Sequence, residues 1–209
     1  FSFGRGKPLP IGGGGALVGP AGVIEATIPG PTPSGYLDMT RAILSKFLSD
    51  KRVYGTLEAL PLGLGETIFN PRFVMEPMSR ALRGLGTSSL RELRSLNEHR
   101  NAMASIYYQI LGDEGQPPFH SSDKAVFTRY PFMAGENPIP EYLRKLGVRR
   151  MYPKAILDEH IIAPYCAADN VPTPGASRIS ERLITMPTHG GIDKEMAKTI
   201  AVAVKEAYL

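Results

Sequence analysis

A run of four glycines, Gly12 to Gly15, stands shortly after Lys7 and leads directly into the apolar residues 16–18. Glycine reaches backbone conformations that other residues avoid, and it lets another group approach the backbone closely. Such a run is typical of a tight turn rather than of a helix. We therefore expect a turn here, followed by a short strand over residues 16–18.

Lys7 is the first candidate for chemistry in this segment. Catalysis by an amine needs the unprotonated form, so a site would have to favour that form by burial or by neighbouring positive charge. The glycine-rich backbone beside Lys7 would let a flat ring approach closely. The alternative is an exposed basic loop, because most lysines are solvated surface groups.

Residues 1–15 resemble the lysine region of the DegT/StrS-type sugar aminotransferases, which are fold-type I pyridoxal-phosphate enzymes. Members of that family carry a Ser-Phe pair, then the lysine that holds the cofactor as a Schiff base, then a glycine-rich turn that enters a strand. At these places the chain has Ser2, Phe3, Lys7 and Gly12 to Gly15. The resemblance implies that Lys7 is catalytic and binds pyridoxal phosphate, and that Ser2 hydrogen-bonds the cofactor phosphate.

Asn70 lies in a segment similar to the family's loop whose asparagine reaches the cofactor phosphate of the neighbouring subunit. The resemblance therefore implies that Asn70 binds the cofactor and that the protein is a homodimer. Leu157 stands where members often have a substrate-contacting histidine, and nearby His160 is expected to be a surface residue. Four further segments resemble the family's long helix and C-terminal signatures: residues 93–111, 147–153, 174–176 and 183–189.

The resemblance covers only the second half of a family member, so we expect a fragment or half-enzyme. The expected fold class is α/β, a remnant of a fold-type I aminotransferase large domain followed by a small C-terminal α/β domain. Residues 1–85 would belong to the large domain, which binds pyridoxal phosphate, and residues 86–209 would form the small domain. In the family, the part that precedes the lysine supplies the acidic partner of the pyridine nitrogen and the ring that stacks on the cofactor.

Hydrophobic periodicity predicts the individual elements. The long helix is expected to begin at a capping box, Ser89 to Glu92, and to end before Gly112, and Asp193 is expected to cap the last helix. Helices are expected over residues 36–48, 73–85, 89–111, 141–146 and 193–208, and strands over residues 125–133 and 183–186.

Charge and cysteine content narrow the classes of partner. The chain has 24 Lys and Arg against 20 Asp and Glu, and its dispersed net charge of +4 argues against a nucleic-acid surface while it suits small anions. The single cysteine, Cys166, cannot form an internal disulfide, and the four histidines lie far apart. We therefore expect a cytoplasmic protein with no structural metal, and no apolar run is long enough to span a bilayer.

Three functions remain open. The first is an aminotransferase that acts on a keto-sugar nucleotide, with Lys7 relaying the proton between substrate and cofactor. The second is a C-terminal half that serves only for dimerisation or partner binding. The third is a pyridoxal-phosphate enzyme with a non-sugar substrate. Two polar features have plainer interpretations: His189 as a turn residue that satisfies local backbone groups, and Arg149 with Arg150 as an exposed basic pair.

Overall fold

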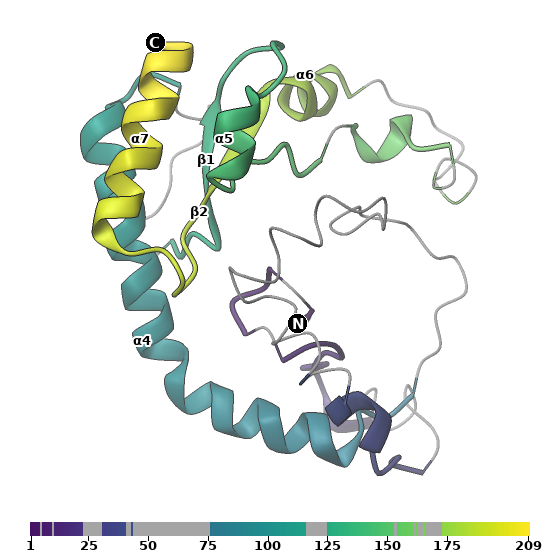
Figure 1. Ribbon diagram of the computed structural model, residues 1–209. Coiled ribbons are helices and arrows are strands. Elements are labelled where there is room, and N and C mark those ends of the chain that lie inside the picture. Colours follow the sequence, from purple (N-terminus) through teal and green to yellow (C-terminus); the bar gives the residue numbers. More distant parts are fainter. Residues whose placement is uncertain are drawn as a thin grey trace. The chain divides into compact units, whose positions relative to one another are not determined.

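Figure 1 shows the chain as a computed structural model. It folds into two compact units, Phe1–Arg94 and Ser95–Leu209. The domain division predicted at residues 85 and 86 stays a prediction. The structure describes residues 1–4, 6–9, 11–22, 31–40, 43, 76–115, 125–152, 154–160, 162, 165 and 173–209.

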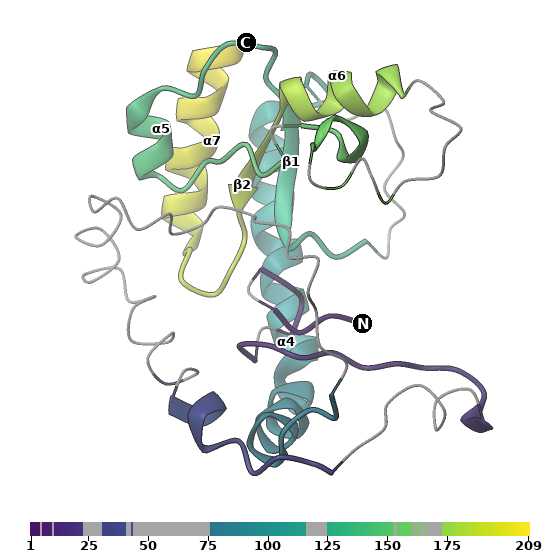
Figure 2. The ribbon, with the colours of Figure 1, turned by 90° about the vertical axis from the view of Figure 1, so that its right-hand side faces the viewer.

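The unit Ser95–Leu209 mixes helices with a small antiparallel sheet, as expected for an α/β domain. In its described residues, β1 (Arg129–Met133) pairs with β2 (Leu183–Pro187), so that Arg129 lies opposite Pro187 and Met133 opposite Leu183. In Figures 1 and 2, α7 runs beside the C-terminal part of α4, and the side chain of Lys205 in α7 donates to the Ile110 carbonyl in α4. The helical segments described for this unit are the C-terminal part of α4 (Arg80–Leu111), α5 (Glu141–Lys145), the 3-10 turn η1 (Ile156–Asp158), α6 (Pro174–Arg182) and α7 (Lys194–Tyr208).

The core of this unit lies between the sheet, the end of α4 and α7. Alternate residues of β1, Tyr130 and Phe132, point into it, as the period of a strand requires. The Tyr107 hydroxyl, also buried, donates to the Pro187 carbonyl at 2.7 Å and so joins α4 to the end of β2. Fully buried apolar side chains complete the core: Leu143, Val148, Ile184, Met186, Ile200 and Val204.

β2 has a neighbour on each side. Arg149 and Thr185 exchange two backbone hydrogen bonds, of 3.1 and 2.8 Å, on the side of β2 away from β1. Because Thr185 uses both backbone groups there, its pairing with Pro131 in β1 is the type without hydrogen bonds. The proline, which has no N–H to donate, therefore interrupts no hydrogen bond between β1 and β2.

The start of the long helix differs from the prediction. α4 begins at Arg80, and it continues through the expected capping box at Ser89 without interruption. The residues that do cap it lie earlier: the Ser79 Oγ accepts from the Leu82 N–H at 3.4 Å, and the Pro33 carbonyl accepts from the Arg80 N–H at 3.0 Å. The separate helix expected over residues 73–85 is thus wrong, because its second half is the first part of α4.

Other boundaries follow the sequence more closely. α4 ends at Leu111 as predicted, and Gly112 follows it with a positive φ of 66°. The helices near residues 141–146 and 193–208 and the strand near residues 183–186 are confirmed within a residue or two. The strand expected over residues 125–133 begins only at Arg129. Of the helix expected over residues 36–48, residues 36–40 are helical and most of the rest lies outside the described residues.

Candidate functional site

Lys7 lies in the loop of a short hairpin whose arms are residues 1–3 and 14–16. The Phe3 N–H donates to the Gly14 carbonyl at 3.0 Å, and Ser2 pairs with Gly15 in an antiparallel bridge. The strand predicted over residues 16–18 is wrong beyond its first residue: Ala16 exchanges two hydrogen bonds with Phe1, of 2.9 and 2.7 Å, but residues 17 and 18 are not part of a strand. The Lys7 N–H donates to the Gly4 carbonyl at 3.3 Å, which closes a turn directly before the lysine side chain.

The glycines of the run are needed where the two arms approach. A Cβ on Gly15 would lie 2.5 Å from the Phe1 carbonyl oxygen, so any side chain there would push the arms apart. Gly14 has a φ of 80°, a conformation that other residues adopt at a cost. The run predicted as a tight turn therefore bends only at Gly12 and Gly13, and Gly14 and Gly15 belong to the second arm of a hairpin whose loop holds Lys7.

Two apolar side chains anchor this loop. Leu9 is 4% exposed and Ile11 is 5% exposed, and the Ile11 N–H donates to the Phe3 carbonyl at 3.2 Å. Lys7 itself is exposed, so the described residues do not bury its amine. The loop is thus held on one side of the lysine while the lysine side chain is free to meet a ligand.

Two of the three predicted site residues lie on this hairpin. The Ser2 hydroxyl and the Lys7 amine are both exposed and belong to the same short stretch of backbone. A hydroxyl suits a phosphate as a hydrogen-bond donor, and an amine suits a carbonyl carbon as a nucleophile. Asn70 lies outside the described residues.

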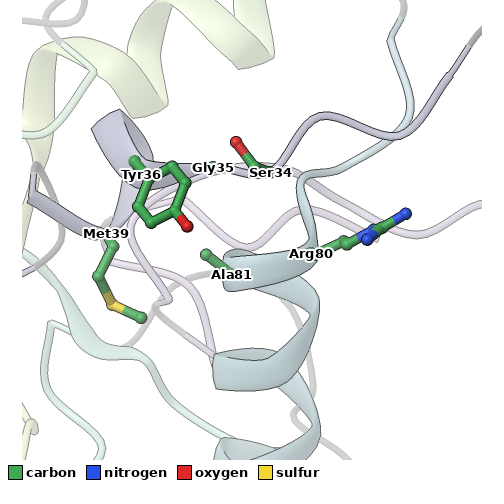
Figure 3. A pocket seen from close by; sticks show the side chains of 6 residues that line it. All are labelled: Ser34, Gly35, Tyr36, Met39, Arg80 and Ala81. Carbon is green, nitrogen blue, oxygen red and sulfur yellow. The ribbon is translucent and has the colours of Figure 1, made fainter.

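A hollow of about 490 Å³ opens near the start of α4. In Figure 3 the Tyr36 ring and the Met39 side chain lie on one side of Ala81, while the Arg80 guanidinium points away on the other. Tyr36 is 83% exposed, and the Ser34 carbonyl accepts from the Ala81 N–H. The hollow is thus an open surface feature beside a capped helix start, and the polar side chains among its described lining residues do not converge on one point.

His160 and His189 agree with the non-catalytic roles expected of them, as a surface residue and a turn residue. His160 is exposed, and Leu157 lies in η1 and is half-buried. The His189 Nδ1 accepts from the Gly191 N–H at 3.2 Å, so this side chain satisfies a local backbone group as predicted. Among the described residues, no three His, Cys, Asp or Glu side chains gather so that they could hold a metal ion.

Three arginines of the second unit, Arg129, Arg149 and Arg150, donate to backbone carbonyls. Arg149 and Arg150 are half-buried, which corrects the exposed pair expected from the sequence, and Arg150 donates to the Gly135 carbonyl at 3.2 Å. Sequence reasoning missed Arg129, whose Nε donates to the Thr185 Oγ1 at 2.7 Å and whose Nη2 donates to a carbonyl oxygen. The sequence could have revealed Arg129 through its position in a predicted strand next to the apolar Tyr130. Side chains alternate between the faces of a strand, so Arg129 lies on the face opposite to Tyr130.

The model of the DegT/DnrJ/EryC1/StrS aminotransferase family matches residues 1–205. No protein with a curated description matches the chain. In the described part of the chain, no helix combines the length and the apolar character needed to cross a membrane.

Solved structures share the fold. Helicobacter pylori PseC, an aminotransferase involved in the biosynthesis of pseudoaminic acid, is 20% identical, with a TM-score of 0.50 over 76% of this chain and 47% of that chain. A Streptococcus pneumoniae protein described as a sugar aminotransferase is 21% identical, with a TM-score of 0.54 over 73% of this chain and 40% of that one. A Bacillus cereus protein described as a PLP-dependent aminotransferase is 13% identical, with a TM-score of 0.54 over 97% of this chain and 50% of that one.

These likenesses confirm the expected fold class, part of a fold-type I aminotransferase. The chain spans about half the length of the structures it matches.

Proposed function

The chain belongs to the DegT/DnrJ/EryC1/StrS aminotransferase family, and from this we propose that it supplies the lysine-bearing half of a pyridoxal-phosphate-dependent aminotransferase site. Pyridoxal phosphate is the cofactor expected of this family. The observation that carries the proposal is the position of Lys7, exposed in the loop of an anchored glycine hairpin that also presents Ser2. The substrate that we propose is a keto sugar linked to a nucleotide.

The donor set of the hairpin fits the cofactor. Pyridoxal phosphate carries an aldehyde, which a primary amine can bind covalently, and a phosphate, which a hydroxyl can hydrogen-bond. Lys7 and Ser2 provide one group of each kind, and neither is buried away from a ligand. A Cβ on Gly13 would meet nothing within 4 Å, so a flat ring has room there, whereas Met78 and the Phe1 carbonyl fill the space beside Gly14 and Gly15.

Ser2 and Lys7 then have separate roles. Ser2 donates its hydroxyl hydrogen to the phosphate and so orients the bound group. Lys7 would hold the group through its Nζ, and the same amine would take up a proton at Nζ from the substrate carbon as the general base. When bound, the cofactor withdraws the electrons left by that proton.

Asn70 enters the proposal from the family resemblance alone. We propose that its amide binds the cofactor phosphate of the neighbouring subunit, which makes the active form a homodimer. Replacing Asn70 by Ala is then expected to weaken cofactor retention in the dimer. A direct readout is the cofactor absorbance that remains after gel filtration.

The second proposed function is a dimerisation or partner-binding module. The chain spans about half the length of the structures it matches, and in the family the part of the fold that precedes the lysine supplies other groups of the site. The two functions differ in whether Lys7 reacts with the cofactor in preference to other exposed lysines.

That preference can be measured directly. The purified chain is incubated with pyridoxal phosphate, reduced with borohydride and digested, and the modified lysines are mapped by mass spectrometry. The aminotransferase proposal predicts stoichiometric labelling at Lys7, abolished by Lys7→Ala and unchanged by Lys194→Ala, which removes another exposed lysine. Labelling spread over the surface lysines, with no preference for Lys7, would reject it in favour of the binding module.

A further inference from the structure

Gly86 occupies an interior position of α4, where glycine is unfavourable. Glycine destabilises a helix interior relative to alanine, because it loses more backbone freedom on folding. Gly86 is buried, and a Cβ built on it would lie 3.3 Å from the Cδ1 of Ile11. Because that separation is shorter than ordinary van der Waals contact between carbon atoms, the missing side chain lets Ile11 lie against the helix.

Ile11 belongs to the hairpin that carries Lys7. It is 5% exposed, and its N–H donates to the Phe3 carbonyl in the first arm of the hairpin. The contact between Gly86 and Ile11 therefore fixes the backbone that follows the lysine.

Gly14, in the hairpin itself, makes room in the same way for a side chain that precedes α4. A Cβ on Gly14 would lie 2.5 Å from the Sδ of Met78, which stands just before the start of α4. The hairpin and the beginning of α4 are thus joined twice, each time where a glycine leaves room for the opposite side chain. Both contacts lie within the unit Phe1–Arg94.

We propose that Gly86 is a positioning residue for the Lys7 amine, because its lack of a side chain keeps the Lys7 hairpin packed on α4. The proposal rests on the proposed function for the role of Lys7. The packing contact itself does not depend on that role. The two claims can therefore fail separately.

Gly84 provides a matched control in the same helix. It lies two positions before Gly86, it is exposed, and a Cβ on it would meet nothing within 4 Å. Leucine at either position improves helix propensity equally. Only Gly86→Leu places atoms where Ile11 lies.

Two measurements on the full chain compare Gly86→Leu with Gly84→Leu. The first is hydrogen exchange at the Phe3 and Ile11 amides, which donate within the hairpin. We expect Gly86→Leu to accelerate it by about tenfold or more, and Gly84→Leu to leave it within about twofold of wild type. The second is borohydride-trapped pyridoxal phosphate at Lys7 relative to Lys194 in the same sample, which we expect only Gly86→Leu to lower.

A rescue variant separates positioning from general damage to the fold. Adding Ile11→Ala to Gly86→Leu removes the atoms that the new leucine would meet, so we expect exchange protection at Phe3 and the Lys7 to Lys194 ratio to recover in part. If Gly86→Leu does not fold, Gly86→Ala tests the same contact with a single methyl group.

Equal exchange rates and equal Lys7 to Lys194 labelling ratios in the Gly84 and Gly86 variants would overturn the inference. Labelling without a preference for Lys7 in wild type, with the exchange difference intact, would instead reject the proposed function.

Discussion

The hydrogen bond from Tyr107 to Pro187 provides the sharpest test of how the second unit is held together. The Tyr107 side chain is fully buried, and its hydroxyl donates to the Pro187 carbonyl at 2.7 Å. Tyr107→Phe keeps the ring and removes the donor, which leaves a buried carbonyl without this partner. Loss of the bond and the unsatisfied acceptor together cost about 1–3 kcal/mol of the free energy of unfolding.

Urea unfolding monitored by circular dichroism measures that loss. Tyr108→Phe is the matched control, because Tyr108 is the next residue of α4, is half exposed, and donates its hydroxyl to the Asp113 carboxylate at 2.8 Å near the surface. We expect this variant to unfold close to wild type. Equal destabilisation by the two substitutions would refute the view that the buried bond joins α4 to β2.

The same tyrosine predicts a dependence on pH. Burial raises the pKa of Tyr107, and the nearby Arg129 opposes that shift only in part. The folded state therefore keeps the phenol proton at a pH where the unfolded state has released it, so stability is complete below about pH 10 and falls above it. Tyr107→Phe is expected to lack this part of the decline, which is up to about 1.4 kcal/mol per pH unit. A wild-type slope that Tyr107→Phe leaves unchanged would contradict the assignment.

Two further substitutions test a helix cap and a close packing contact in the same unit. Asp193→Ala should cost about 1 kcal/mol in thermal unfolding, because the Asp193 Oδ1 accepts from the Met196 N–H at 2.8 Å, while Asp193→Asn keeps an acceptor and should cost less. Gly115→Ala should destabilise by about 1–3 kcal/mol more than Gly112→Ala in the same assay, because both glycines have positive φ but only at Gly115 would a methyl group overlap the Phe132 ring. Equal losses at the two glycines would show that backbone strain, not the ring, decides the cost.

Local signals in the sequence predicted the second unit well. The last helix has its apolar residues on one face, and Asp193 stands where a cap is needed, so periodicity and capping agree. The end of α4 was equally clear, because Gly112 can adopt the positive φ that stops a helix. Both signals involve residues only a few positions apart along the chain.

The start of α4 and the pairing of the hairpin needed information from distant residues. Ser89 has the spacing of a capping box, yet Ser79 caps the helix, because the Pro33 carbonyl is also available to accept from the first N–H of α4. Ser2 pairs with Gly15 across a loop, and no local pattern reveals that register. The candidate site was found through Lys7 and the glycine run. Its third predicted member, Asn70, stays a prediction.

The proline in β1 has a consequence for how the protein behaves in concentrated solution. β2 lies between β1 and Arg149, so in the described part of the chain β1 is the outer strand of the sheet. Pro131 stands at its centre, and its imide nitrogen faces away from β2, the side on which the Met133 N–H donates to the Gly115 carbonyl. A second molecule that approached to extend the sheet would find no donor at that point, and intermolecular strand addition, a common first step of aggregation, is disfavoured there.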